Sequence, residues 1–197
     1  SSFHELPIVL GVVQAPGSGA AMGVGAAAAP TLEQAWLKAL AEAFATRSAA
    51  RKFALVEPER TYAADGSDVL TLEDHIRFYA DDAHAAAARF LITGVTRRVS
   101  DVPSLEPVRA EERVARLVER ISAAGSRAYA VDVTAPDVRT TGLSVIKMVA
   151  PGLCALDVPH VARFQGTPRL LHLAEKDTLT AAGRFLHDLN PLPHPFP

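Results

Sequence analysis

The end of the sequence limits its structure more than any other part, because four of the 14 prolines fall within the last seven residues. Prolines at every second position, from Pro191 to Pro197, lack the N–H groups that a helix or a central β-strand needs. We therefore predict that residues 190–197 form an extended tail near the polyproline II conformation. Because proline fixes φ in advance, such a tail loses little entropy when it docks. The alternatives are a loose chain end or a ligand for a proline-binding module.

Upstream of the tail, strand and helix patterns alternate along the chain. Strands are predicted from apolar and β-branched runs at 6–15, 128–133 and 143–149. Helices are predicted at 31 to about 52, from 71 onward, at 110–124 and at 178–189. The glycine-rich stretch 16–25 is expected to turn and bend, and 134–137 has the composition of a turn. The class predicted is α/β (α+β-like), with a mixed sheet and flanking helices.

The first predicted helix has a clear start. Thr31 and Gln34 fit a capping box, in which the Thr31 hydroxyl accepts from the Gln34 amide and the Gln34 side chain accepts from the Thr31 amide. Trp36, Leu40 and Phe44 follow at i, i+4 spacing. This spacing predicts an apolar stripe that faces the core.

The composition is that of an ordinary globular protein and excludes several classes. The formal net charge is −2, with 21 % charged and 49 % hydrophobic residues, which argues against a disordered chain and against a generally basic binder of nucleic acid or membrane surfaces. No apolar run approaches the roughly 20 residues that cross a bilayer. The single cysteine, Cys154, excludes a disulfide framework and favours a reducing compartment. We therefore expect a cytoplasmic protein with no nucleic-acid or membrane partner.

Four stretches resemble the YcaO family of azoline-forming cyclodehydratases, in the order in which the family carries them. The tail with Pro193, Pro195 and Pro197 resembles the family's C-terminal end. Residues 132–153 resemble its strand-turn-strand that ends in Pro-Gly-Leu, and residues 72–79 resemble its mid-domain helix. Lys38 to Glu42, followed by Arg47, resembles the family's Arg-Ala-Leu-Thr-Glu … Arg helix, with lysine in place of the first arginine.

This resemblance implies that residues 1–189 are the C-terminal portion of a larger catalytic domain, followed by the tail at 190–197. The family's earlier ATP-binding elements, a Ser-containing glycine turn and a Glu-x-x-Glu-Arg helix, do not occur in the sequence. The N-terminal portion of the domain is therefore an expected partner. The other implied partners are a ribosomal precursor peptide, a leader-binding partner protein and a second copy in a homodimer.

The implied reaction is ATP-dependent ring formation in a peptide. A Cys, Ser or Thr side chain attacks the preceding amide carbonyl, ATP phosphorylates the oxyanion, and an azoline remains after phosphate leaves. Such chemistry requires carboxylates that hold Mg²⁺ on the phosphates, cations that neutralise developing charge, and a base.

The resemblance also assigns residues to these tasks. Lys38, Glu42 and Arg47 would bind the nucleotide, and Glu42 would hold Mg²⁺. Pro193, Pro195 and Pro197 would position the chain end in the active site, where the Pro197 carboxylate is our candidate base; a purely structural tail that closes the pocket is the rival. From spacing alone, Lys38 and Glu42 also fit an exposed ion pair on one helix face.

Two other functions stay open. The same family also forms backbone thioamides. A chain without the earlier ATP-binding elements also fits an inactive module that docks a peptide or a partner protein.

Overall fold

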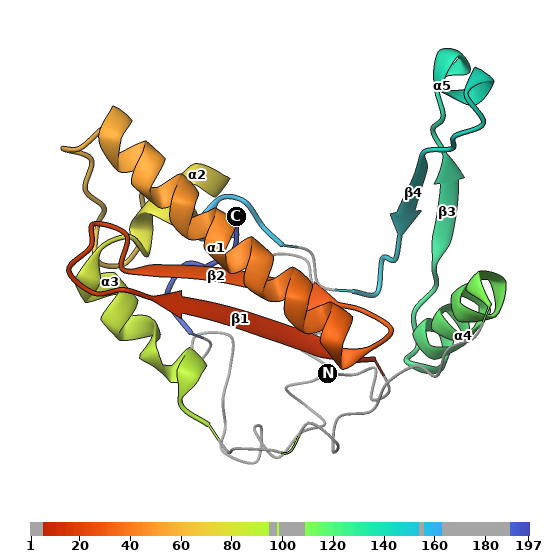
Figure 1. Ribbon diagram of the computed structural model, residues 1–197, viewed down its shortest axis with the longest axis horizontal. Coiled ribbons are helices and arrows are strands. Elements are labelled where there is room, and N and C mark those ends of the chain that lie inside the picture. Colours follow the sequence, from red (N-terminus) through yellow and green to blue (C-terminus); the bar gives the residue numbers. More distant parts are fainter. Residues whose placement is uncertain (1–5, 95–97, 99–108, 154–155, 163–189) are drawn as a thin grey trace.

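The computed structural model describes residues 6–94, 98, 109–153, 156–162 and 190–197. Its larger body is a β-hairpin with a long helix across one face (Figure 1). β1 (Ile8–Gln14) and β2 (Met22–Ala28) pair antiparallel, with Leu10 opposite Ala26. The helix α1 (Leu32–Val56) begins where expected, and the Thr31 hydroxyl accepts from the Gln34 amide at 3.3 Å.

Eight further elements follow in the described residues. They are α2 (Leu72–Phe78), α3 (Asp82–Ala87), the 3₁₀ helix η1 (Ala88–Ile92), α4 (Ala110–Ala123), β3 (Tyr129–Asp132), α5 (Pro136–Thr140), β4 (Ile146–Val149) and the 3₁₀ helix η3 (His160–Ala162). The short helices α2, α3 and η1 lie on the other side of the hairpin or along its edge (Figure 1).

The helix α1 packs on the hairpin through its smallest side chains. The buried residues of α1 are Ala35, Ala39, Ala43, Thr46 and Ala50. They face glycines of both strands, and a Cβ added at Gly25 would collide with the backbone of Ala39 and Ala43. The backbones of the helix and of the sheet are therefore in close contact, which only residues as small as alanine and glycine permit.

Two sequence predictions are wrong for this reason. The stripe of Trp36, Leu40 and Phe44 faces away from the hairpin, and the Trp36 and Phe44 side chains are 53 % and 57 % exposed. The stretch 22–28 is a strand rather than part of a bend, because its glycines accommodate α1. The turn is confined to the residues between β1 and β2, where Ala15 donates to the Ala21 carbonyl.

The opposite face of the hairpin carries the main core. Met22 and Val24 of β2 pack with Phe78 and Tyr79 at the end of α2. The start of α2 at Thr71 is as predicted, with a complete capping box between Thr71 and Asp74. The helix α2 ends at Phe78 with Tyr79 as its cap, so Ala83 belongs to α3 and is exposed.

A second hairpin, β3–β4, extends away from this body (Figure 1). Tyr129 lies opposite Val149, and every residue of both strands is exposed. The strands at 128–133 and 143–149 and the helix at 110–124 are confirmed, and Gly125 has the positive φ of a residue that ends a helix. The turn predicted at 134–137 instead opens the short helix α5, with Pro136 in its first turn.

The predicted combination of helices and strands is therefore confirmed, but the described strands form two antiparallel two-stranded sheets and not one mixed sheet. The helix expected at 178–189 and the residue Cys154 lie outside the described residues. Among the described helices, none is both long and apolar enough to span a membrane.

Candidate active site

The proline-rich tail lies against the core in an extended form. The described residues 190–197 contain neither helix nor strand, and the Pro193 side chain is fully buried. Leu192 and Phe196 pack against the cluster that includes Met22 and Phe78.

Two side chains of α2 and its cap hold consecutive carbonyls of the tail. The Tyr79 hydroxyl donates to the Pro193 carbonyl at 2.5 Å. The Nδ1 atom of His75 lies 2.8 Å from the His194 carbonyl, and its Nε2 atom lies 2.7 Å from the Val158 carbonyl. The His75 ring therefore joins the tail to the segment that precedes η3.

A glycine allows Pro193 to reach its buried position. Gly66 has φ 68°, and a Cβ there would collide with the Pro193 ring and approach the His160 ring to 3.2 Å. Both the backbone conformation and the contact require glycine at this place.

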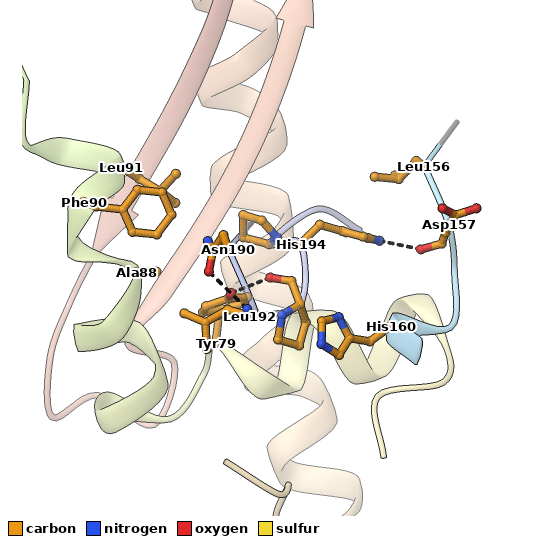
Figure 2. A pocket seen from close by; sticks show the side chains of 12 residues that line it. Tyr79, Ala88, Phe90, Leu91, Leu156, Asp157, His160, Asn190, Leu192 and His194 are labelled. Carbon is orange, nitrogen blue, oxygen red and sulfur yellow. Dashed lines mark hydrogen bonds between the residues drawn. The ribbon is translucent and has the colours of Figure 1, made fainter. Parts of the chain in front are cut away.

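The tail forms one wall of a cavity of about 220 Å³ (Figure 2). The cavity is mainly apolar, with two aromatic rings, two histidines and the carboxylate residue Asp157 at its border (Tyr79, Ala88, Phe90, Leu91, Leu156, Asp157, His160, Asn190, Leu192, Pro193, His194 and Pro195). An engineered cavity of about 150 Å³ is enough to hold benzene. This one has room for a side chain of similar size.

The environment of His194 disfavours its charged form. Burial, followed by the charge of His75, lowers the pKa of His194 to about 4. The two rings are stacked with centroids 3.6 Å apart, and His194 Nε2 lies 2.9 Å from the Asp157 carbonyl. A neutral ring with its proton on Nε2 donates this bond. Burial also raises the pKa of Tyr79, which keeps its hydroxyl a donor.

The carboxylate of Asp74 fixes the start of α2. One oxygen accepts from Arg60 and Tyr62, and the other accepts from the backbone amides of Leu70 and Thr71. Burial opposes ionisation of this carboxyl, but the hydrogen bonds from Tyr62 and Thr71 outweigh it and lower the pKa of Asp74. The ionised Asp74 thereby anchors the helix that carries His75 and Tyr79.

On α1, Glu42 is the candidate residue that hydrogen-bonds to the outer edge of β2. Its Oε2 atom accepts from the Ala26 amide of β2 at 2.7 Å. Thr46, one turn later, donates to the Val24 carbonyl of the same strand at 3.0 Å. These two side chains cover the edge of β2 that faces away from β1.

The other two nucleotide candidates lie apart from one another. Lys38 is exposed, and within the described part of the chain it makes no ion pair with Glu42. Arg47 donates to the Ala20 carbonyl at 3.1 Å and to the Ser18 hydroxyl at 3.0 Å, so it braces the turn between β1 and β2. No hydrogen bond or ion pair between described residues joins these three side chains to the tail.

The donor set fits a metal ion held partly by phosphate. The described residues contain no group of three or more His, Cys, Asp or Glu side chains that could hold a metal ion by themselves. Mg²⁺ binds through one or two carboxylates, phosphate oxygens and water, so one carboxylate with a second oxygen to offer meets its needs. Glu42 uses only Oε2 for Ala26. Lys38, one turn earlier, adds a positive charge on the same side of α1.

The sequence pattern missed the residues that hold the tail. His75, Tyr79, Asp74 and Gly66 received no role, although three of them lie in the stretch 72–79. A signal was present: His75 and Tyr79 are four apart and share one face of a helix. Nothing in the spacing indicated that their partners lie more than a hundred residues later.

Comparisons with known proteins agree with this architecture. No curated protein matches the sequence. A solved structure titled "Heterocyclase in complex with substrate and Cofactor" matches 97 % of this chain with a TM-score of 0.63 and 19 % identity. The match covers 23 % of that chain, so the present chain spans about a quarter of its length. The fold is therefore shared with part of a heterocyclase.

A family model gives the assignment. Residues 1–154 match the family described as "YcaO cyclodehydratase, ATP-ad Mg2+-binding". This range includes β1, β2, α1 and α2, which carry Glu42 and the two side chains that hold the tail. The chain belongs to the YcaO cyclodehydratase family.

Proposed function

We propose that this chain is part of an ATP-dependent peptide cyclodehydratase, which converts Cys, Ser or Thr residues of a ribosomal precursor peptide to azolines. The observation that carries the proposal is the family match over residues 1–154. The docked tail supports it, because a chain end held by buried side chains can place a reactive group reproducibly.

The proposed roles divide between two regions. Glu42, which accepts from the Ala26 amide, would hold Mg²⁺, and Lys38 would offer a positive charge to the phosphates. Arg47 acts indirectly, through the turn that it braces. ATP, when bound, supplies the phosphoryl group that makes the amide oxygen a leaving group.

The tail supplies the proposed base. Pro193, Pro195 and Pro197 fix the direction of the last residues, and the Pro197 carboxylate accepts the proton that the peptide nucleophile loses as its bond to the carbonyl carbon forms. The cavity is bordered by Pro193 and Pro195 of the same tail and has room for a peptide side chain.

The proposed setting is cytoplasmic. The proposed partners are the precursor peptide, a leader-binding protein, the N-terminal portion of the domain and a second copy. The one cysteine in 197 residues supports a reducing compartment.

The test is mass spectrometry of a precursor peptide incubated with the full-length gene product, its partner protein, Mg²⁺ and ATP. Loss of water that requires ATP is expected. Glu42→Gln keeps an acceptor for the Ala26 amide but loses the charge, so activity should fall on the order of 100-fold with an unchanged melting temperature. Glu33→Gln, an exposed glutamate in the first turn of α1, is the matched control.

Other outcomes assign the alternatives. Exchange of oxygen for sulfur, given a sulfur source, would identify thioamide formation. No peptide change and no ATP consumption would favour an inactive docking module. Adding one residue after Pro197 moves the carboxylate and should abolish turnover, as should deletion of Pro195–Pro197; unchanged turnover in the extended variant would exclude the base role.

A further inference from the structure

The carbonyl groups of the tail need donors from elsewhere. Of the last five residues, only His194 and Phe196 have a backbone N–H, because the other three are prolines. Such a segment cannot form the paired ladder that holds an ordinary strand. If its carbonyls are buried, side chains must supply the hydrogen bonds.

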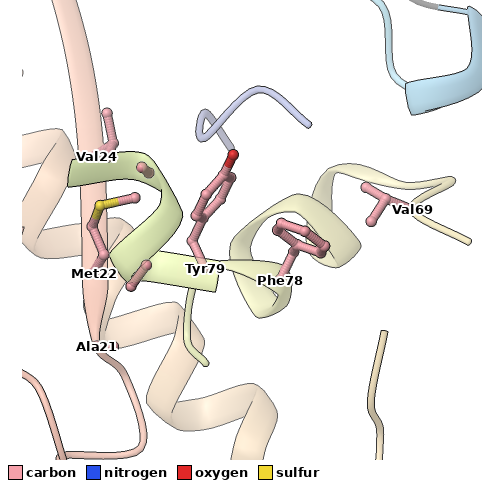
Figure 3. Packing of buried hydrophobic residues seen from close by; sticks show 8 residues of the cluster. Ala21, Met22, Val24, Val69, Phe78 and Tyr79 are labelled. Atoms are coloured by element: carbon pink, nitrogen blue, oxygen red, sulfur yellow. The ribbon is translucent and has the colours of Figure 1, made fainter. Parts of the chain in front are cut away.

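His75 and Tyr79 supply them to adjacent carbonyls. They lie one helical turn apart, and their bonds go to His194 and Pro193 respectively. The hydroxyl of Tyr79 points from the β2 side of the core toward the tail (Figure 3). The Tyr79 ring lies in the same cluster as Met22 and Val24, so the donor is fixed by packing.

The ring of His75 has an unusual pair of partners. Both ring nitrogens lie within 2.8 Å of a carbonyl oxygen, so the ring lies between two backbone acceptors. The residue is 0 % exposed, so no water can replace either partner. A single buried side chain thus joins the tail to Val158.

We propose that His75 and Tyr79 are positioning residues that hold the tail carbonyls and so place the chain end for the peptide reaction. This role rests on the proposed function for its effect on turnover. The holding of the tail is measured independently of turnover.

Hydrogen exchange of the C-terminal peptide, on the full-length gene product, measures tail docking. Tyr79→Phe removes one hydroxyl and keeps the ring, and His75→Gln leaves a side chain that reaches only one carbonyl. In each variant the amides of His194 and Phe196 should exchange about tenfold faster, as expected for one lost hydrogen bond. Tyr129→Phe, at an exposed residue of β3 in the second hairpin, is the matched control. Unchanged exchange in the two test variants would overturn the proposal.

Kinetics on the same proteins separate positioning from stability. Each test variant should lower kcat about tenfold or more, with the KM for ATP unchanged. Faster exchange with full turnover would reject the positioning role. If the unsubstituted protein forms no azoline, the proposed function fails, while the exchange data still decide whether the tail is held.

Discussion

Asp74 is the single residue on which the position of α2 depends most directly. The residue is 3 % exposed, and its carboxylate accepts four hydrogen bonds, from Arg60, Tyr62 and two backbone amides. We expect Asp74→Ala to destabilise the chain by about 3 kcal/mol, since it leaves buried donors without an acceptor. Denaturant unfolding measures this, with Asp68→Ala as the control, because exposed Asp68 accepts only from the Ala63 amide among the residues that the structure describes. A loss as small as that of the control would contradict the role.

The same carboxylate gives the stability a defined pH dependence. The pKa of Asp74 is lower in the folded chain than in the unfolded one, so the unfolded chain binds more protons as the pH falls. Its contribution is therefore present above the ordinary aspartate pKa of about 4 and is lost below it. Asp74→Asn should remove this part of the acid sensitivity, and unfolding curves at pH 7 and pH 3 compare the two proteins.

His194 makes docking of the tail sensitive to mild acid. Its ring faces His75 of α2 and His160 of η3, and its pKa falls from 6.5 to about 4 when docked. Between these values the free tail binds a proton that the docked tail does not, so docking weakens as the pH falls from 6.5 toward 4. Protection factors of the Phe196 amide should drop roughly tenfold between pH 7 and pH 5. The variant His194→Gln does not titrate and should show no such drop; an equal drop in both proteins would assign the effect elsewhere.

At the level of elements, the contact between α1 and the hairpin depends on glycines, which have no side chain. A methyl group at Gly25 would collide with Ala43 N and with the Cβ of Glu42, each at 2.6 Å. Gly25→Ala should therefore destabilise the chain by about 2 to 3 kcal/mol and displace Glu42 from Ala26. Thermal unfolding measures the loss. Gly94→Ala is the control, since a Cβ there meets nothing within 4 Å, and equal stability of the two variants would contradict the close contact.

Local sequence patterns predicted those helix ends that depend only on neighbouring residues. The cap at Thr31, the cap at Thr71 and the glycine after α4 each act within one turn, so the sequence could place them. The buried face of α1 could not be predicted from its apolar period. The apolar period predicted that Trp36 and Phe44 are buried. In the structure the alanines of α1 are buried instead, because they pack against glycines of the hairpin that become their neighbours only on folding.

The candidate site likewise has features that the sequence predicts and others that it does not. The extended form of the tail follows from the missing N–H groups of its prolines, which is a property of each residue. Its docking follows from contacts such as that between His75 and His194, 119 positions apart, and no local pattern encodes such a distance. Glu42 was singled out by resemblance, but its bond to Ala26 depends on β2, which the sequence analysis did not recognise as a strand.

At the scale of the whole molecule, the chain presents more apolar surface than a monomer usually exposes. Large apolar side chains cover the outward face of α1, namely Trp36, Leu37, Leu40 and Phe44, and both strands of the second hairpin are exposed. Contiguous patches of this kind mark surfaces that bind other protein surfaces. We therefore expect the isolated chain to self-associate through the outward face of α1, with a second copy as the occupant.

The double substitution Trp36→Glu and Phe44→Glu tests this association. Both side chains are exposed in the single chain, so the melting temperature should change little, while charges placed in an apolar interface should weaken association at least ~100-fold. Sedimentation velocity over a concentration series measures the effect. Leu143→Glu, an exposed residue beside β4, is the control and should leave association unchanged. Because Trp36 is the single tryptophan, its emission in the unsubstituted chain should shift to the blue as concentration rises. A monomer at every concentration, with red-shifted Trp36 emission throughout, would show that this face does not join two copies.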